Sequence, residues 1–327
     1  MAVIRYAGRS FSVAEGESVL ETLLSANYEI PNSCRAGVCQ SCVMQLVDGE
    51  IDPSAQKGLK DSWQAQDLFL ACRCHPDQDL EIRLPAVDHI RVGCQVTGHD
   101  RLSGGILRLR LRPESQFDYR PGQYVTLWRD TTLGRSYSLA SVPVLDGDEL
   151  EFHIKRFSNG RLSSWLCDCV NVGDRIALQG PGGYCFYTGN DAEQDLLLAG
   201  AGTGLAPLYG ILRDALQRGH TGQIHLYHGA VDIEGLYLHE TLQELAATHQ
   251  NLHYHPCTLN EPPGRCHDVR VENLNQLLSR ERSGLQGWKV YLCGPDEFVK
   301  KQRQHCFLAG AGLKDIYADA FINHSQP

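Results

Sequence analysis

Three cysteines stand in the spacing C-x4-C-x2-C, namely Cys34, Cys39 and Cys42, and a fourth, Cys72, follows later in the chain. This is the ligand pattern of a plant-type 2Fe-2S cluster. Such a cluster needs thiolates that converge from one short loop and one outside point, with backbone N–H groups close to the sulfurs. Small residues allow that approach, and the loop contains Ser33, Ala36, Gly37 and Ser41. We therefore predict that the four cysteines are the metal ligands of a 2Fe-2S cluster.

A structural zinc site is the first alternative for these cysteines. It would combine Cys39 and Cys42 with Cys72 and Cys74, in paired spacings of the kind that zinc ribbons use. Such a site leaves Cys34 without a role, whereas the cluster uses all three cysteines of the loop. We favour the cluster and expect Cys74 not to be a ligand. Ordinary buried cysteines are the second alternative.

A glycine-rich turn follows the apolar run at residues 196–199 and extends over residues 200–207. Glycines at a strand-to-helix turn let a diphosphate approach the backbone. Thr203 suits the cap of the following helix, and Pro207 suits its first turn. The spacing is G-x-G-x-G, which departs from the dinucleotide fingerprint, so a turn that only packs tightly is the alternative. We predict that Gly202, Thr203 and Gly204 bind a nucleotide.

Two other strand ends carry further nucleotide-binding candidates. Asp232 follows the strand expected at residues 224–227 and can accept a hydrogen bond from a ribose 2'-hydroxyl. No Lys or Arg stands near it to receive a 2'-phosphate, which favours NADH over NADPH; a helix N-cap is the alternative role. Cys293, Gly294 and Pro295 end a late strand, where doubly wound folds bind their ligands.

The middle of the chain contains residues that fit a flavin. A flavin requires an apolar or aromatic face, a hydroxyl near its reacting nitrogen, and cationic and N–H donors for its phosphates. Arg135, Tyr137 and Ser138 offer such groups within four residues. A second set follows the strand that ends at residue 155, and it consists of Gly160, Arg161, Leu162 and Ser163. Singly, these are common surface, strand and cap residues, so the prediction depends on their order.

Three patterns of hydrophobicity divide the chain into three predicted domains. Residues 1–88 mix short strands with one helix, which indicates a small α+β domain around the cysteine loop. Residues 91–189 contain short strands punctuated by Pro-Gly and Asp-Gly turns, which indicates a closed antiparallel barrel. Residues 190–327 alternate apolar strands with helical periods, which indicates a doubly wound parallel sheet.

The expected elements can be stated by residue number. The strands are residues 2–6, 10–13, 43–47, 80–84, 106–111, 124–128, 150–155, 196–199, 224–227 and 290–292. The helices are residues 18–26, 205–216, 236–246 and a segment from 296 onward. All of these follow from periodicity and turn residues alone.

Composition and charge exclude some classes of protein. The chain has 327 residues, 13 cysteines and a formal net charge of −9, so we expect no nucleic-acid-binding surface. It shows no signal-peptide pattern and no apolar run long enough to span a membrane. We therefore expect a cytoplasmic protein with reduced cysteines. Residues 1–88 hold 7 Lys+Arg against 13 Asp+Glu, an acidic surface that can steer a basic partner or simply keep the protein soluble.

The order of the motifs resembles the ferredoxin-NADP reductase-like flavoproteins. The shared motifs are Arg135-x-Tyr137-Ser138, Gly160-x-x-Ser163, the turn at 200–207, and Cys293-Gly294-Pro295. With its N-terminal ferredoxin pattern, the whole chain resembles the NADH-dependent reductase components of bacterial oxygenases, such as the naphthalene dioxygenase type. The resemblance implies a β-grasp ferredoxin domain, an antiparallel Greek-key FAD barrel and a doubly wound NAD domain. FAD, rather than FMN, is implied in the same way.

Roles for single residues follow from this resemblance. Arg135 would contact the flavin phosphate, Tyr137 would pack on the isoalloxazine ring, and Ser138 would lie near N5. Residues 160–163 would cradle the diphosphate. Cys293 would help to place the nicotinamide, and Phe321 would shield the flavin until the nicotinamide displaces it. Six residues follow Phe321, so a strictly terminal aromatic residue is absent.

The resemblance implies a chain of electron transfer from NADH through FAD and the 2Fe-2S cluster to a separate ferredoxin or an oxygenase component. NADH gives two electrons at once and the cluster accepts one, so a flavin must stand between them. The work of the protein is then mostly positioning, without a dedicated acid–base pair. Two alternatives remain: a reductase for the deoxygenation of nucleotide sugars, and a subunit that conducts electrons or senses redox state without catalysis.

Overall fold

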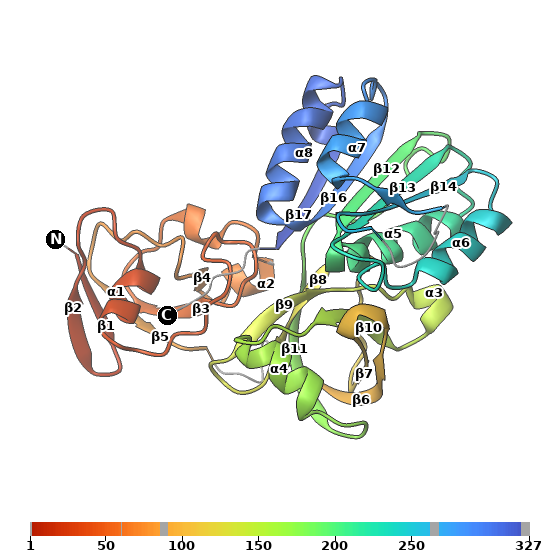
Figure 1. The fold of residues 1–327 in the computed structure, drawn as a ribbon. Coiled ribbons are helices and arrows are strands. Elements are labelled where there is room, and N and C mark those ends of the chain that lie inside the picture. Colours follow the sequence, from red (N-terminus) through yellow and green to blue (C-terminus); the bar gives the residue numbers. More distant parts are fainter. Residues whose placement is uncertain (1, 60, 86–90, 262–267, 322–327) are drawn as a thin grey trace.

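Three β-sheets follow one another along the chain and form three bodies that touch (Figure 1). The computed structural model describes residues 2–59, 61–85, 91–261 and 268–321. The first body holds the cysteine loop, the second is the barrel, and the third is the parallel sheet. Among the described residues, no helix combines the length and the apolar composition needed to span a bilayer.

The first body is a five-stranded mixed sheet with one main helix against it. Its strands are β1 (Val3–Tyr6), β2 (Arg9–Ser12), β3 (Val43–Asp48), β4 (Leu68–Leu70) and β5 (Leu80–Arg83), and its helices are α1 (Val19–Ser25) and α2 (Asp61–Gln64). The strand order is β2-β1-β5-β3-β4, and β1 and β5 run parallel. Ser18 and Glu21 form a capping box that starts α1. The buried face of α1 packs on the sheet, as the expected α+β domain requires.

The second body is an antiparallel barrel. Its strands are β6 (Val92–Arg101), β7 (Ile106–Pro113), β8 (Tyr124–Trp128), β9 (Gly134–Ser138), β10 (Leu150–Lys155) and β11 (Arg175–Gly182), with helices α3 (Pro143–Asp146) and α4 (Arg161–Asp168). The order β10-β7-β6-β11-β8-β9 brings the two edges together, where Ala140 N–H donates to the Glu151 carbonyl at 2.9 Å. Alternate residues of the strands fill one apolar core.

The third body is a parallel sheet of six strands with helices on both faces. Its strands are β12 (Leu196–Ala201), β13 (Ile224–Ala230), β14 (Leu252–Thr258), β15 (Arg270–Val271), β16 (Lys289–Pro295) and β17 (Ile316–Phe321). Its helices are α5 (Leu205–Gln217), α6 (His239–Thr248), α7 (Leu274–Glu281) and α8 (Asp296–Leu308). Separate cores lie under α5 and α6 and under α7 and α8. The strand order is β15-β14-β13-β12-β16-β17. All strands are parallel, but the chain builds the sheet outward from β12 first to one side and then, from β16, to the other. Sheets of this kind bind ligands at this switch point between β12 and β16.

The short 3-10 turns connect these elements. They are η1 (Pro53–Gln56), η3 (Ser103–Gly105), η4 (Gly202–Gly204) and η5 (Leu313–Asp315). η4 lies between β12 and α5, so the glycine-rich turn forms a 3-10 turn that leads directly into α5. Gly204 is the N-cap of α5 and no side chain caps that helix. The expected capping role of Thr203 is therefore wrong, because the chain has already begun to coil one residue earlier.

Two other expectations about this body are tested by the structure. The helix expected at 236–246 begins only at His239, because Leu238 adopts a left-handed backbone with φ of 60°. The apolar pattern includes residues that are buried in the turn before the helix, such as Leu236. Pro207 lies in the first turn of α5, as expected.

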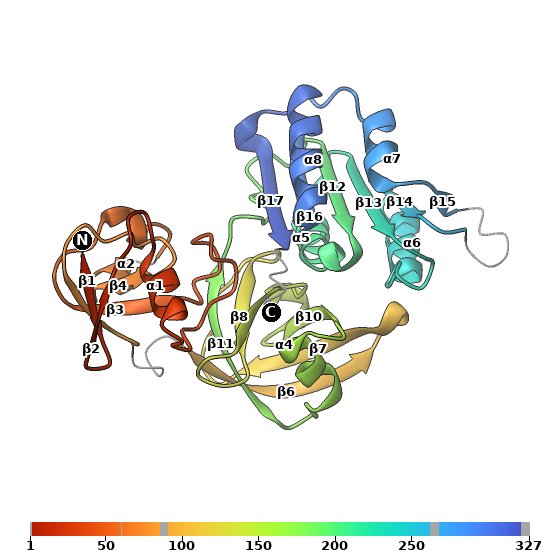
Figure 2. The same cartoon turned by 60° about the vertical axis from the view of Figure 1, so that its left-hand side comes forward.

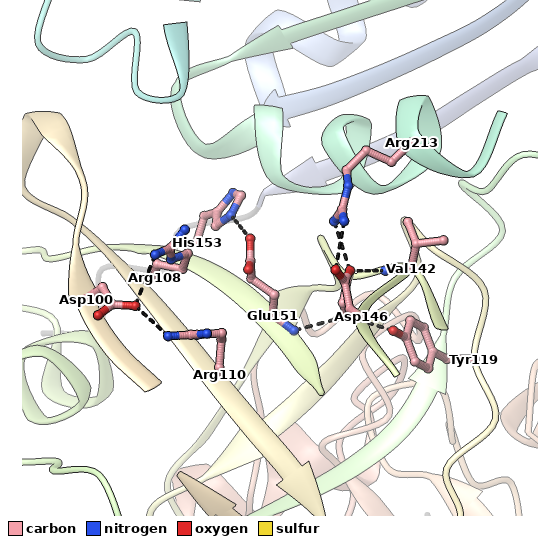
Figure 3. Close-up of polar contacts among 10 residues, drawn as sticks. Asp100, Arg108, Arg110, Tyr119, Val142, Asp146, Glu151, His153 and Arg213 are labelled. Carbon is pink, nitrogen blue, oxygen red and sulfur yellow. Dashed lines mark hydrogen bonds and ion pairs between the residues drawn. The ribbon is translucent and has the colours of Figure 1, made fainter. Parts of the chain in front are cut away.

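Polar contacts lock the barrel to the parallel sheet. Arg213 of α5 forms a two-pronged ion pair with Asp146 of α3, with N–O distances of 2.7 and 2.9 Å (Figure 3). Asp146 also accepts the Val142 N–H at 2.7 Å. Both charged side chains are mostly buried, and two parallel bonds fix the orientation as well as the contact. The barrel and the nucleotide-binding sheet are thus held in one relative position.

Candidate cofactor sites

The four predicted cluster cysteines lie together in two pairs. The Cys34 and Cys39 thiols are within hydrogen-bond reach of each other, and so are those of Cys42 and Cys72. Cys39, Cys42 and Cys72 are buried, and Cys34 is half-buried. Two pairs of thiols suit two iron atoms, each of which takes two protein sulfurs.

Backbone N–H groups surround the sulfurs of Cys34 and Cys39, as an iron–sulfur cluster requires. Cys34 Sγ accepts N–H groups from Ala36, Val38 and Cys39 at 3.2 to 3.4 Å. Cys39 Sγ accepts the Cys34 N–H at 3.3 Å and the hydroxyl of Ser41 at 3.2 Å. The hydrogen bond with Cys39 and these backbone donors hold the pKa of Cys34 below its ordinary value. These donors therefore favour the thiolate of Cys34, the form that binds iron, whereas the hydrogen bond with Cys34 and burial raise the pKa of Cys39.

The backbone of the loop explains why small residues are needed there. Gly37 has φ of 77°, and a Cβ at this position would lie 2.6 Å from the Arg73 side chain. Arg35 and Gln40 also have positive φ values, which turn successive N–H groups inward. Gly37 donates its own N–H to Cys72, so it serves the second pair of cysteines.

Cys74 belongs to neither pair, because no other cysteine among the described residues acts on its pKa. It is buried in the apolar core of the first body, and burial raises its pKa to about 12. In the described part of the chain, no three His, Cys, Asp or Glu side chains gather as a site for one metal ion would require. The two pairs contain the four cysteines that were predicted as cluster ligands and do not include Cys74.

Two strands of the barrel hold the cysteine loop. Thr126 donates its hydroxyl to the Cys39 carbonyl at 3.2 Å, and Gln179 donates to the Gln40 carbonyl at 2.9 Å. Tyr124 Oη donates to the Val38 carbonyl. These side chains come from β8 and β11, which lie beside the first body in both views (Figures 1 and 2). The three acceptors are the carbonyls of consecutive residues, so the hydrogen bonds hold both the distance and the orientation of the loop relative to the barrel.

The residues expected to bind the flavin lie along β9 and α4. Arg135 Nη1 donates to the carbonyls of Gly134 and Asn32, at 2.8 and 3.2 Å. Tyr137 packs against the barrel core, and burial raises its pKa. Arg135 and Tyr137 point to the same face of β9 because side chains alternate along a strand. Arg161, at the start of α4, is close enough for its charge to act on Arg135.

The turn that begins α4 has the close packing expected of a cradle. A Cβ on Gly160 would lie 2.2 Å from Ser163 Oγ. Ser163 Oγ accepts the Phe157 N–H at 3.3 Å, and no side chain caps the helix. Leu162 is buried in the barrel core, so only its backbone can face a ligand. The turn therefore offers N–H groups to an anion such as a diphosphate.

The glycine-rich turn and the end of β16 pack directly on each other. A Cβ on Gly204 would lie 2.1 Å from the Cys293 carbonyl oxygen. Gly202 has φ of 56°, and nothing lies within 4 Å of the place that a Cβ would take there, so a ligand can approach its backbone. Gly294 has φ of 136° and lies against Ala201. This geometry fits a dinucleotide at the switch point of the sheet.

The end of β17 closes the same region. Register pairs join Cys293 to Asp319 and Pro295 to Phe321, so Phe321 lies beside the expected nicotinamide site. Cys293 is fully buried, its Sγ lies 3.6 Å from Cys185 Sγ, and burial raises its pKa. Cys293 is therefore a neutral thiol that contributes shape and contact, and it is unsuited to be a nucleophile.

One hydrogen bond joins the barrel and the parallel sheet at this point. Ser138 Oγ donates to Asp319 Oδ2 at 2.9 Å. Burial raises the pKa of Asp319 to about 6, an effect that the Ser138 hydrogen bond partly offsets. A titratable carboxyl group thus stands next to the hydroxyl that was expected near flavin N5. The sequence motifs had not assigned it.

We expect Asp319→Asn to stabilise the protein, and more at pH 8 than at pH 5. An aspartate is ionised above about pH 4 in an unfolded chain, but Asp319 stays neutral up to about pH 6 when folded. As the pH rises through this window, the folded state alone bears the cost of charging this partly buried group, which is at most about 3 kcal/mol above pH 7. The asparagine removes that cost and keeps an oxygen for Ser138. Thermal unfolding at the two pH values measures the effect; an equal shift at both would contradict it.

The remaining expected residue, Asp232, lies beyond the end of β13. It is exposed and accepts the Gly235 N–H at 2.9 Å through Oδ1, while α6 begins seven residues later at His239. Asp232 therefore caps a turn and is not a helix N-cap. Its other carboxylate oxygen has no hydrogen bond within the described chain and is available to a ribose hydroxyl.

The structure reveals contributors that the motifs did not indicate. Tyr124, Thr126 and Gln179 hold the cysteine loop through contacts that span at least 86 residues of sequence. Asp319 is the acidic member of an otherwise mostly apolar strand, and this pattern is the signal that could have indicated it. Residues that meet across such separations leave no local periodicity to read.

The chain matches three families of domains in sequence order. Residues 4–77 match the 2Fe-2S iron-sulfur cluster binding domain, residues 93–187 the oxidoreductase FAD-binding domain, and residues 197–304 the oxidoreductase NAD-binding domain. The chain therefore has binding domains for all three expected cofactors, and the three kinds of fold that were predicted are confirmed.

Relatives share this arrangement over nearly the whole chain. The reductase component of the naphthalene 1,2-dioxygenase system of Pseudomonas putida, a ferredoxin–NAD(P)+ reductase, is 33% identical over 325 residues, or 96% of both chains. The reductase subunit of an aromatic O-demethylase from Amycolatopsis is 33% identical over 312 residues, or 90% of both. A solved structure of a cytochrome P450 reductase from Amycolatopsis matches 98% of this chain and 99% of its own, with a TM-score of 0.68 and 27% identity. The chain belongs to the family of iron–sulfur flavoprotein reductases that serve oxygenase systems.

Proposed function

We propose that this protein is an NADH-dependent reductase that passes electrons through FAD and a 2Fe-2S cluster to an oxygenase component or a separate ferredoxin. The observation that carries the proposal is that two adjacent strands touch both ends of the route. Tyr124 and Ser138 are register partners on β8 and β9. Tyr124 contacts the cysteine loop, while Ser138 contacts Asp319 beside Cys293.

The chemistry comes from the cofactors and the positioning comes from the chain. When bound, NADH supplies a hydride, FAD converts two electrons into single ones, and the cluster accepts one at a time. Gly202, Thr203 and Gly204 present their backbone to the nucleotide at the switch point of the sheet. Ser138 and Cys293 set the place of the reacting rings, and the neutral Cys293 thiol adds no charge of its own there.

The cluster side is held by the barrel. Cys34, Cys39, Cys42 and Cys72 are the proposed ligands of the cluster. The hydrogen bonds from Thr126 and Tyr124 keep the Cys34–Cys39 pair toward the barrel, which shortens the path from the flavin. A fixed short path matters because electron transfer between carriers does not require a reacting side chain, only proximity.

An anaerobic titration of the purified protein with NADH and then NADPH tests the proposal. We expect bleaching of the flavin absorbance together with the low-temperature EPR signal of a reduced 2Fe-2S cluster, at lower concentrations of NADH. Flavin reduction without the EPR signal would remove the cluster from the route. No response to either nucleotide would overturn the proposal and support a subunit without catalysis. Assays with a partner oxygenase or ferredoxin then identify the acceptor.

Asp232 makes a prediction about the choice of nucleotide. We expect Asp232→Ala to reduce the preference for NADH over NADPH by about tenfold, because it removes a hydrogen bond to the ribose and a charge that repels a 2'-phosphate. The ratio of kcat/KM for the two nucleotides measures this preference. Unchanged selectivity would show that Asp232 only caps its turn.

The proposed location is the cytoplasm. Thiol ligands must stay reduced to bind iron, and a reducing compartment keeps them so. The thiol chemistry of the cysteine loop is the basis of this proposal. The acidic surface of residues 1–88 remains a candidate for contact with an acceptor.

A further inference from the structure

Three arginines from three separate segments lie near one another, since the charges of Arg161 and Arg35 both act on Arg135. Arg35 belongs to the cysteine loop, Arg135 to β9 and Arg161 to the first turn of α4. Arg135 is half-buried, and burial together with the charges of Arg161 and Arg35 lowers its pKa. Other arginines of the barrel do have carboxylate partners, for example Arg108 and Arg110, which both pair with Asp100 (Figure 3). Within the described part of the chain, no carboxylate pairs with any of these three arginines.

Asn32 ties two of these guanidinium groups together across the domain boundary. Arg135 Nη1 donates to the Asn32 carbonyl at 3.2 Å, and Arg35 Nε donates to Asn32 Oδ1 at 3.1 Å. A guanidinium has five N–H donors, so most donors of both groups have no partner among the described residues. Glu21 is close enough for its charge to interact with that of Arg35, but it forms no ion pair with Arg35, and its Oε2 accepts the N–H and the hydroxyl of Ser18.

The position of this positive charge matches a diphosphate. Arg161 stands at the uncapped start of α4, where backbone N–H groups favour an anion. The family resemblance gives Arg135 and the turn at 160–163 to the diphosphate of FAD, but it gives no role to Arg35. A group with two negative charges would relieve the repulsion between the three cations, and guanidinium groups bind phosphates in pairs of hydrogen bonds.

We propose that Arg35 completes the diphosphate site of FAD from the iron–sulfur domain, so that bound FAD clamps this domain onto the barrel. The inference rests on the proposed FAD site and adds a residue from another domain to it. Linkage makes the effect reciprocal: if docking strengthens FAD binding, FAD binding strengthens docking by the same factor. The clamp would hold the cysteine loop in position only when the flavin is present to supply electrons.

The first test compares FAD affinity in two variants. We expect Arg35→Gln to weaken FAD binding to flavin-free protein about tenfold, the change expected for one charge-assisted contact. Arg83→Gln is the matched control, because Arg83 is an exposed arginine of the same domain whose Nε donates to Gln45 at 3.0 Å. Fluorescence quenching of added FAD measures the affinity, and visible absorbance confirms an intact cluster. Equal affinities in both variants and the parent would overturn the proposal.

The second test measures the docking of the iron–sulfur domain by hydrogen exchange and needs no turnover. Hydrogen exchange of residues 32–40 is measured with and without FAD. In the parent protein FAD should slow exchange in this loop, and in Arg35→Gln the slowing should be smaller.

The difference in FAD affinity between the parent protein and Arg35→Gln should also shrink at high salt, since salt screens charge contacts. Equal slowing in both proteins would overturn the clamp, while failure of NADH to reduce the bound flavin would instead overturn the proposed function.

Discussion

Replacing Cys39 with serine should lower electron delivery to a protein acceptor such as cytochrome c by about 100-fold or more, since the cluster is the proposed carrier between the flavin and such an acceptor. Cys39 is at the centre of the loop: its Sγ accepts the Cys34 N–H and the Ser41 hydroxyl, and its carbonyl accepts the Thr126 hydroxyl. A serine hydroxyl is a harder and less acidic ligand than a thiol and suits iron poorly. Ferricyanide, which takes electrons from the flavin, should still be reduced by NADH.

The matched control for this prediction is Cys74→Ser. Cys74 is buried like Cys39 but lies in the apolar core of the domain, and it is outside both cysteine pairs. It should keep the cluster spectrum and the delivery to cytochrome c, even if the protein is somewhat less stable. Loss of the cluster in Cys74→Ser would favour the zinc-type ligand set. Survival of both activities in Cys39→Ser would exclude the cluster from the route.

Gly204→Ala should weaken NADH turnover by about tenfold to a hundredfold, measured as kcat/KM with ferricyanide. Gly204 has an ordinary helical backbone, with φ of −58°, so alanine meets no conformational penalty there. The obstacle is space, since the new Cβ would lie 2.1 Å from the Cys293 oxygen and 2.6 Å from its carbon. Both are backbone atoms of β16, so the glycine-rich turn must move away from Cys293 and Gly294.

This displacement should affect the nucleotide and spare the other cofactors. Flavin content, cluster absorbance and reduction by dithionite should stay at the level of the parent protein. Gly284→Ala is the matched control in the same body, because its nearest neighbouring atom would be 3.6 Å from the new Cβ and its backbone is not left-handed. An unchanged kcat/KM in Gly204→Ala would show that the turn has space to adjust and that its tight packing does not shape the NADH site.

Local chemistry was readable from the sequence by itself. The spacing of Cys34, Cys39 and Cys42 sets a loop in which neighbouring sulfurs and N–H groups must meet, and the structure has these contacts. Strands with strong apolar character appeared where expected, and β8 and β10 have the expected bounds. Such features depend on residues a few positions apart, whose geometry is set by backbone periodicity and turn residues.

Weakly patterned elements were less accessible. β4 has only three residues and β15 only two, too few for an alternation to show. The predicted start of α6 was three residues too early. Leu236 lies before the helix, but it is apolar because it is buried there. Apolar character records burial, and helical bounds depend on the dihedral angles of single residues such as Leu238.

Only the tertiary structure decided how the three bodies form one site. Ser138 and Asp319 are 181 positions apart, and Arg135 and Asn32 are 103 apart. Three contacts depend on how the sheets pack: the pairing of Cys42 with Cys72, the hydrogen bond from Thr126 to Cys39, and the hydrogen bond from Arg135 to Asn32. Such partners meet through the shape and charge of whole surfaces. The sequence determined which groups can bind iron, flavin and nucleotide, and the packing of the three bodies determined which of those groups face one another.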